Sequence, residues 1–197
     1  MSKLIVSLLC FFSIFAANAQ AKTLMVFGDS LSAAYNLRQQ QGWVSLLGEQ
    51  INQSHPDITI INASISGETT QGGLARLPKL LETHQPTWFV LELGANDGLR
   101  GYPLNQAKQN LASMIELIQQ HSADIVLLGN HLPSNYGRTY TTQFFNLYKE
   151  LAEQYQIAYV PFMLENVALD KSLMQSDGLH PNAAGQPIVL NNIAPVL

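Results

Sequence analysis

The chain has 197 residues, with ten Lys and Arg against fourteen Asp and Glu, and a formal net charge of −4 at pH 7. A mildly acidic chain has no electrostatic attraction to nucleic acid and little to an anionic membrane surface. Its single cysteine, Cys10, excludes a disulfide within the chain and any site built from several cysteines.

The first residues resemble a secretory signal peptide. A basic start at Lys3 precedes the mostly apolar residues 4–17, and small residues match cleavage after Ala19 or Ala21. The apolar run is shorter than the ~20 residues that span a bilayer, although an uncleaved anchor helix is the alternative. Cleavage after Ala19 leaves residues 20–197 with a net charge of −5. We expect a periplasmic or secreted protein with no stable membrane anchor.

Five short apolar runs alternate with helix-like stretches along the rest of the chain. The runs predict strands at 23–27, 59–62, 88–93, 125–128 and 158–160, and the stretches predict helices at 43–52, 72–82, 104–120, 143–155 and 183–193. The 104–120 segment shows the helical period best, because its apolar residues recur on one face. Near-continuous apolar strands alternating with helices predict a parallel sheet covered on both faces. We therefore expect an α/β fold, a three-layer α/β/α sandwich of about five strands, in one domain over residues 20–197.

Polar and glycine-bearing segments follow the predicted strands. Gly-Asp-Ser occupies 28–30, Asn62 to Gly67 follow the second strand, Gly94-Ala95-Asn96-Asp97 the third, and Asn-His-Leu-Pro at 130–133 the fourth. Ligands of open α/β sheets bind beyond the carboxyl ends of the strands. These segments should therefore lie together at one edge of the sheet.

Asp177, His180 and Ser30 supply a carboxylate, a base and a hydroxyl. An Asp-x-x-His spacing in a turn lets the carboxylate reach the imidazole Nδ1, which leaves Nε2 free to take a proton from a serine. Each pattern alone is weak, since Gly-Asp-Ser also makes ordinary turns and Ser30 could cap a helix. A non-catalytic module that binds an anion or a sugar is the alternative of another class, but such a module needs no base.

Acyl transfer requires donors for an oxyanion. The N–H of Gly67 is unobstructed by a side chain, and the Asn96 amide and the Ser30 N–H are further candidates. Asn96 alone could equally be an Asx-turn residue.

Residues that could bind the substrate or support the site are predicted from their positions beside these loops. Five apolar residues could form an acyl-chain groove, or belong to the core: Leu31, Leu99, Leu132, Phe162 and Leu179. His131 is a further candidate for this groove, and the loop 99–103 could close over it. Asp29 and Asp97 are expected to hold loops, and Glu92 to pair with a backbone group or with Arg100. No cluster has metal-ligand spacing, so we expect neither metal nor cofactor.

Four blocks, in order, resemble the SGNH, or GDSL, hydrolase superfamily. They are Phe-Gly-Asp-Ser-Leu-Ser at 27–32, Asn-Ala-Ser-Ile-Ser-Gly-Glu-Thr at 62–69, Gly-Ala-Asn-Asp at 94–97 and Asp-Gly-Leu-His-Pro at 177–181. Similarity continues through 73–78 and 133–137, and is greatest to the bacterial TesA-type group of periplasmic esterases. That group is described as acyl-CoA thioesterases, lysophospholipases and arylesterases with some protease activity.

This resemblance implies a flavodoxin-like fold and a serine hydrolase acting on small acyl esters and thioesters. It implies Ser30 as nucleophile, His180 as base, Asp177 as its orienting carboxylate, and Ser30, Gly67 and Asn96 as the oxyanion hole. A carbohydrate O-acetylesterase of the same superfamily is the alternative enzyme.

The chain departs from the pattern of the superfamily at three places. Ala34 stands where glycine is frequent, and His131 where close relatives can carry arginine. The end after Gly185 is short and only weakly similar, so we expect the last helix to be trimmed.

Overall fold

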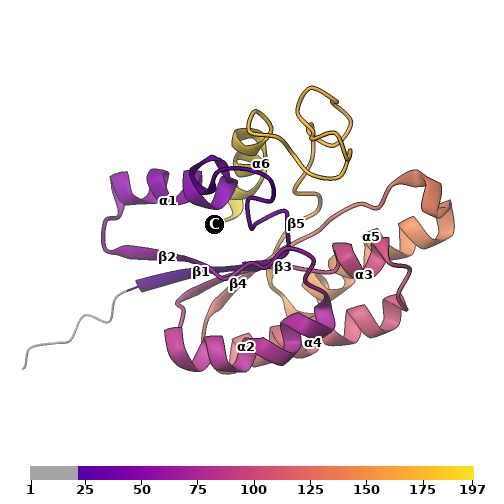
Figure 1. Cartoon of the computed structure of the whole chain (residues 1–197). Coiled ribbons are helices and arrows are strands. Elements are labelled where there is room, and N and C mark those ends of the chain that lie inside the picture. Colours follow the sequence, from indigo (N-terminus) through magenta and orange to yellow (C-terminus); the bar gives the residue numbers. More distant parts are fainter. Residues whose placement is uncertain (1–21) are drawn as a thin grey trace, which may run out of the picture.

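The computed structural model describes residues 22–197, so the predicted signal peptide lies outside the described residues. Its sheet has the strand order β2-β1-β3-β4-β5 with every pair parallel. The strands are β1 (Lys22–Gly28), β2 (Ile58–Asn62), β3 (Trp88–Glu92), β4 (Asp124–Leu128) and β5 (Ala158–Val160). In Figure 1 the strands run away from the N-terminal side, so their carboxyl ends share one edge. The predicted parallel sheet of five strands is confirmed.

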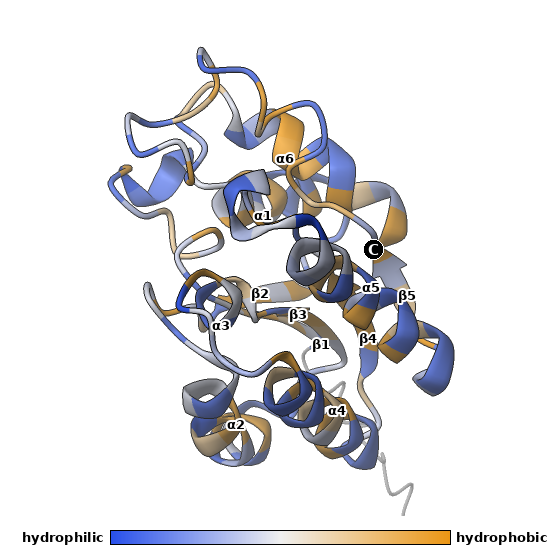
Figure 2. Cartoon of the chain, turned by 90° about the vertical axis from the view of Figure 1, so that its right-hand side faces the viewer, coloured by the Kyte–Doolittle hydropathy of each residue, from blue (hydrophilic) through white to orange (hydrophobic). Residues whose placement is uncertain are grey.

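Helices cover both faces of this sheet (Figures 1 and 2). On one face lie α1 (Trp43–Ser54) and α6 (Gln186–Ile193), and on the other α2 (Thr70–His84), α4 (Leu104–Gln120) and α5 (Arg138–Tyr155). The short helix α3 (Ala95–Leu99) follows β3, and three 3-10 turns are η1 (Gln39–Gln41), η2 (Ser134–Tyr136) and η3 (Ala194–Val196). Among residues 22–197 no helix is long and apolar enough to cross a membrane.

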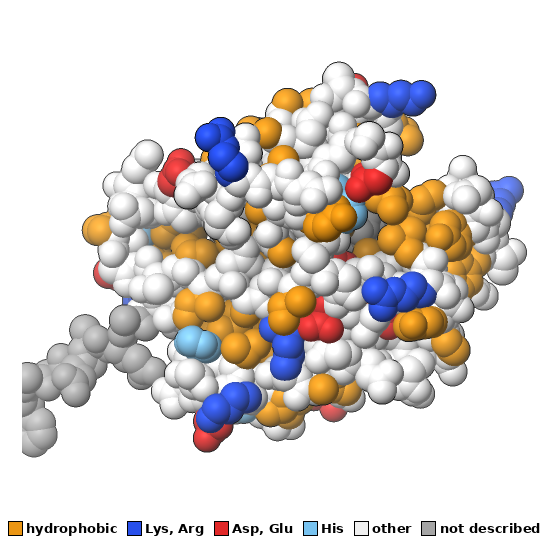
Figure 3. Space-filling model, in the orientation of Figure 1, with side chains coloured by type: hydrophobic (Ala, Val, Ile, Leu, Met, Phe, Trp, Pro, Cys, Tyr) orange, Lys and Arg blue, Asp and Glu red, His pale blue; other side chains and the backbone are white. Residues whose placement is uncertain are grey.

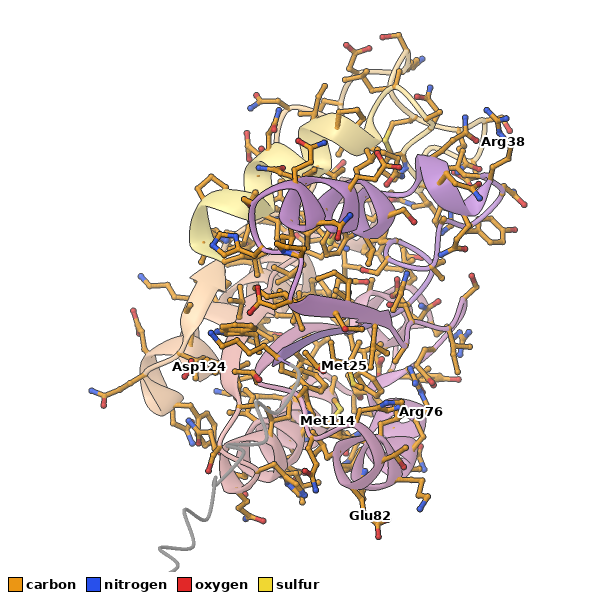
Figure 4. All side chains as sticks on the ribbon, turned by 90° about the vertical axis from the view of Figure 1, so that its left-hand side faces the viewer. Met25, Arg38, Arg76, Glu82, Met114 and Asp124 are labelled. Carbon is orange, nitrogen blue, oxygen red and sulfur yellow. The ribbon has the colours of Figure 1, made fainter. Side chains whose placement is uncertain are left out.

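The alternation of side chains along β1 explains the two apolar layers. Leu24 and Val26 pack with α1 and α6, whereas Met25 and Phe27 pack with α2, α4 and α5. Successive residues of a strand point to opposite faces, so a strand covered on both sides is apolar throughout. Figure 4 shows Met25 of β1 and Met114 of α4 in the layer between sheet and helices, and both are fully buried.

The helix predictions were accurate where the apolar period was continuous. The helix at 104–120 has the predicted bounds. In contrast, α2 begins two residues before the predicted start, because the Thr69 side chain caps it by accepting the Gly72 N–H. Helix α5 begins at Arg138 rather than at 143, and its first turn was missed because that turn is polar and shows no apolar period. The last helix begins at Gln186, not 183, because the Asn182 side chain accepts the N–H groups of residues 184 and 185 in a turn before it.

The strand order reverses between β1 and β3. The chain leaves β1 towards β2 on one side and returns to β3 on the other, so the carboxyl ends of β1 and β3 lie side by side, with Gly28 opposite Glu92. In doubly wound sheets this reversal opens a crevice outside the strand ends. The segment after each of the two strands is therefore available to a single site.

Candidate active site

The turn after β1 places Ser30 at the edge of the sheet. Gly28 is buried, and a Cβ atom there would collide with the Glu92 carboxyl group and the Ser32 hydroxyl. The Asp29 side chain then accepts the N–H of Leu31 at 3.0 Å, which closes the turn around Ser30. Ser30 itself is half-buried, so its hydroxyl lies at the surface of this edge.

A continuous line of hydrogen bonds connects Ser30, His180 and Asp177. The Ser30 Oγ lies 2.7 Å from His180 Nε2, and His180 Nδ1 lies 2.7 Å from Asp177 Oδ2. A carboxylate only accepts, so Nδ1 carries the hydrogen of this contact and Nε2 is the acceptor for the serine hydroxyl. The structure thus brings Ser30 within hydrogen-bond distance of His180, 150 positions further along the chain.

The second oxygen of Asp177 organises its own loop. Oδ1 accepts the N–H groups of Leu179 at 2.9 Å and His180 at 3.0 Å. Partial burial acts to raise the pKa of Asp177, but these N–H groups and the imidazole outweigh it and hold the pKa below its usual value. Asp177 is therefore ionised over the neutral range, as a group that orients a histidine must be.

Three hydrogen-bond donors are available at the site. Among residues 22–197 the backbone N–H groups of Ser30 and Gly67 have no acceptor. Asn96 in α3 donates one amide hydrogen to Asp29 Oδ2 at 2.9 Å, and its second hydrogen has no acceptor within the described chain. An unpaired donor at a solvent-accessible site is free to bind a ligand oxygen.

The loop that carries Gly67 is fixed from two sides. Its Ile65 N–H donates to the Gly28 carbonyl at 3.0 Å, and the Arg100 guanidinium donates to the Gly67 carbonyl at 3.0 Å. Gly67 has φ of 79°, a conformation that glycine adopts without strain. Of the two partners expected for Glu92, the structure shows the backbone group, since Glu92 accepts the Asp29 N–H at 3.1 Å, whereas Arg100 donates to the Gly67 carbonyl instead.

Asp29 and Asp97 hold loops by hydrogen bonds, as predicted. Asp97 accepts the N–H of Thr70 at 2.9 Å and its hydroxyl at 2.7 Å, which joins α3 to the start of α2. Burial raises the pKa of Asp29 to about 6, although the Leu31 N–H, the nearby His180 and the Asn96 amide oppose the rise. Asp29 thus accepts hydrogen bonds from Leu31 and Asn96, and its negative charge faces the His180 imidazole. Burial disfavours that charge, so Asp29 gains a proton at a higher pH than an exposed aspartate does.

A groove of about 1130 Å³ runs from Ser30 and His180 past the loop after β4 and the segment after β5. Figure 3 shows a hollow in the right-hand part of the molecule, with hydrophobic side chains gathered beside it. Its lining contains all five apolar residues expected there: Leu31, Leu99, Leu132, Phe162 and Leu179. Leu31 and Leu132 also belong to the core, so one side of each is packed and the other faces the groove.

His131 also lines this groove. Its ring stacks on Phe145 with centroids 4.0 Å apart and meets the Phe162 ring edge-on at 4.6 Å. Partial burial lowers the pKa of His131, and the charge of Glu165 opposes this only in part. At neutral pH His131 is therefore an uncharged aromatic part of the wall.

Two contacts at the site had no counterpart in the sequence pattern. The Tyr35 ring packs against His180 with centroids 4.6 Å apart, and the Gln175 side chain donates to the Tyr35 carbonyl at 2.9 Å. Both join segments that lie far apart in the chain, so no local spacing could have indicated them. Within residues 22–197 no group of three or more His, Cys, Asp or Glu side chains is placed to hold a metal ion.

Comparisons with known proteins point to one family. Residues 26–188 match the GDSL-like Lipase/Acylhydrolase family. The chain is 49% identical to "Esterase TesA" of Pseudomonas aeruginosa over 91% of this chain and 89% of the relative. It is 44% identical to "Arylesterase" of Vibrio mimicus over 96% and 95%. It is also 42% identical to "Thioesterase 1/protease 1/lysophospholipase L1" of Escherichia coli over 89% and 83%.

Solved structures agree with these sequence relatives. The crystal structure of TesA superposes with a TM-score of 0.87 at 48% identity, over 89% of this chain and 98% of that chain. The psychrotrophic esterase EstA from Pseudoalteromonas sp., in a structure inhibited by monoethylphosphonate, superposes with a TM-score of 0.84 at 40% identity, over 89% and 96%.

Proposed function

The chain belongs to the GDSL-like lipase/acylhydrolase family and hydrolyses acyl esters, and we propose that it does so through an acyl-enzyme formed on Ser30. The relatives named esterase and thioesterase imply small-molecule ester and thioester substrates. The observation that carries the proposal is the hydrogen-bonded line from Asp177 through His180 to Ser30.

This line supplies the acid and base of both half-reactions. As Ser30 Oγ attacks the acyl carbonyl, His180 Nε2 takes the hydroxyl proton and then gives it to the leaving alkoxide or thiolate. Water next attacks the acyl-enzyme and loses a proton to Nε2, and that proton returns to Ser30 Oγ as the carboxylic acid leaves. Asp177 holds the Nδ1–H tautomer and stabilises the imidazolium in each step.

The unpaired donors supply the stabilisation of the tetrahedral oxyanion. The N–H groups of Ser30 and Gly67 and the free amide hydrogen of Asn96 come from the ends of three neighbouring strands. Removing one such donor lowers turnover by roughly 100-fold or more in serine hydrolases. Asp29 holds Asn96 in place, because its carboxylate accepts a hydrogen bond from the other amide hydrogen of Asn96.

The groove beside Ser30 is proposed to bind the acyl chain. Its apolar lining by Leu31, Leu99, Leu132, Phe162 and Leu179 favours an aliphatic or aryl group, and each buried methylene contributes ~0.8 kcal/mol. Because His131 is neutral there, it adds no charge to this apolar part of the wall. This apolar lining suits an acyl chain better than a sugar, so a carbohydrate O-acetylesterase is less well supported.

A fluorophosphonate label and an ester panel test the proposal together. We expect the wild-type protein to be labelled at Ser30 and to hydrolyse p-nitrophenyl esters, with kcat/KM rising from acetyl to longer acyl groups. Ser30→Ala should abolish labelling and lower kcat by roughly 10³-fold or more, while the melting temperature stays that of the wild type. Wild-type turnover by this variant would refute the nucleophile, and activity confined to acetyl esters would favour the O-acetylesterase.

Export to the periplasm or the medium is proposed from residues 1–19, which lie outside the described residues. Aminoterminal sequencing of the exported protein should begin at residue 20 or 22, and retention of Met1 would contradict it.

A further inference from the structure

Glu92 contacts both flanks of the proposed nucleophile. It is the last residue of β3, only 2% exposed, and lies opposite Gly28 in the register with β1. Its Oε2 accepts the Asp29 N–H at 3.1 Å and the Ser32 hydroxyl at 2.8 Å. These two residues stand immediately before and two positions after Ser30. One carboxyl oxygen therefore holds the turn on both sides of the reacting hydroxyl.

No cation balances this carboxyl group within residues 22–197. The ion pairs of that part of the chain lie elsewhere, and the titratable groups facing Glu92 are the acids Asp29, which follows β1, and Tyr148 in α5. Burial raises the pKa of Glu92 well above its usual value, and the charge of Asp29 raises it further. A buried acid without a cation takes up a proton rather than ionise.

We propose that Glu92 is a positioning residue for Ser30, acting as a neutral acceptor that fixes the turn between Asp29 and Ser32. This inference rests on the proposed function, since it assigns a partner to the same nucleophile. A neutral Glu92 leaves the negative charge of this buried region to Asp29. That carboxylate can then hold Asn96 and face the imidazolium of His180 during turnover.

Neutrality makes the proposal testable with a matched pair of variants. Glu92→Gln keeps the shape and the accepting oxygen but cannot ionise, whereas Glu92→Leu keeps the volume and leaves both donors without an acceptor. Ser32→Ala removes one donor from the other side. Each variant is assayed for kcat and KM on a p-nitrophenyl ester, for its pH profile, for the rate of fluorophosphonate labelling and for melting temperature.

We expect Glu92→Gln to retain kcat within about threefold, with an unshifted acid limb of the pH profile. Glu92→Leu should lose roughly 100-fold in kcat and in labelling rate with KM nearly unchanged, because displacing a nucleophile by about 1 Å has this effect on a reaction that depends on orientation. Ser32→Ala should lose about 3- to 10-fold, and adding it to Glu92→Leu should cause little further loss, since both act through one contact.

Two results would overturn the inference. A Glu92→Gln enzyme as impaired as Glu92→Leu, or one with its acid limb moved to lower pH, would show that an ionised carboxylate is required. Wild-type kcat in both Glu92→Leu and Ser32→Ala would show that the contacts do not position Ser30. If Glu92→Leu does not fold, Glu92→Gln and Ser32→Ala still decide each point.

Failure of the proposed function would look different. In that case the wild-type protein itself would not be labelled at Ser30, or Ser30→Ala would remain active. If the wild-type enzyme is labelled at Ser30 but the Glu92 variants do not behave as expected, only the role of Glu92 is refuted.

Discussion

Ser30 and His180 lie 2.7 Å apart but come from regions that are built differently. Ser30 follows the central strand β1, whose residues 23–28 are buried, and its turn is tied to the buried Glu92 of β3. His180 follows the exposed residues 176–179, in the segment 161–185, which contains no helix or named strand. The proposed nucleophile is thus held by the core, and the proposed base by its own loop.

Local hydrogen bonds replace the core in that loop. Asp177 accepts two backbone N–H groups, and an isolated bridge joins Met174 to Pro181. The Asn182 side chain donates to the carbonyls of Ser172 and Met174 at 2.7 and 3.2 Å. A pair such as Asp177 and His180 can therefore be preorganised by a few residues, without burial. The core is needed to position Ser30 and the donors proposed for the oxyanion, which follow separate strands.

The largest effect expected from this difference belongs to Asp177→Asn. Its oxygen can still accept the loop N–H groups, but its amide would face His180 Nδ1 and favour the tautomer whose Nε2 carries hydrogen. That tautomer cannot take the serine proton, so we expect kcat on p-nitrophenyl esters to fall by roughly 10³- to 10⁴-fold.

The melting temperature of Asp177→Asn should stay within a few degrees of the wild type, because surface changes in a loop alter stability little. A variant that unfolds instead would show that this loop supports the fold and would remove the distinction between the two regions. Asp170→Asn is the matched control, since that carboxylate holds Ser172 in the same segment without touching His180.

Asp29→Asn probes the other region through stability. The pKa of Asp29 is about 6 in the folded protein against a usual 3.8, so the folded state binds more protons than the unfolded state between these values. Wild-type stability contributed by this group is therefore present at low pH and is lost as pH rises towards 6. The difference in unfolding free energy, variant minus wild type, should grow by about 1–3 kcal/mol from pH 4 to pH 7.

Urea unfolding at several pH values measures this difference for Asp29→Asn. Comparing the change with pH removes the constant effect of the new amide on its neighbours. A difference independent of pH would mean that Asp29 is ionised at no cost, and the contrast with Asp177, whose pKa is lowered, would fail.

Sequence reasoning was most successful for features that are continuous in the chain. The strands were found within two residues because their apolar runs are unbroken, and the fold follows from their alternation with helices. Helix α3 was missed because five residues are too few to show a helical period. The Glu92 contacts depend on the register of β1 against β3, which no local pattern encodes. The placement of Ser30 against His180 could be expected, but the supports behind Ser30 could not.

The smallest expected effect concerns the contact that joins the two regions. Gln175 Nε2 donates to the Tyr35 carbonyl at 2.9 Å and to the Pro181 carbonyl at 3.1 Å, while the Tyr35 ring packs against His180. Gln175→Leu removes these bonds at similar volume, and a hydrogen bond of this kind contributes about 1 kcal/mol, so we expect kcat to fall about 5-fold with labelling of Ser30 slowed equally. Gln175→Glu, which keeps the oxygen but not the donor, should match it. A loss of kcat as large as that of Asp177→Asn would mean that the position of His180 depends on the segment that carries Ser30 and Tyr35. No loss of kcat would mean that the loop around His180 fixes the position of His180 without this contact.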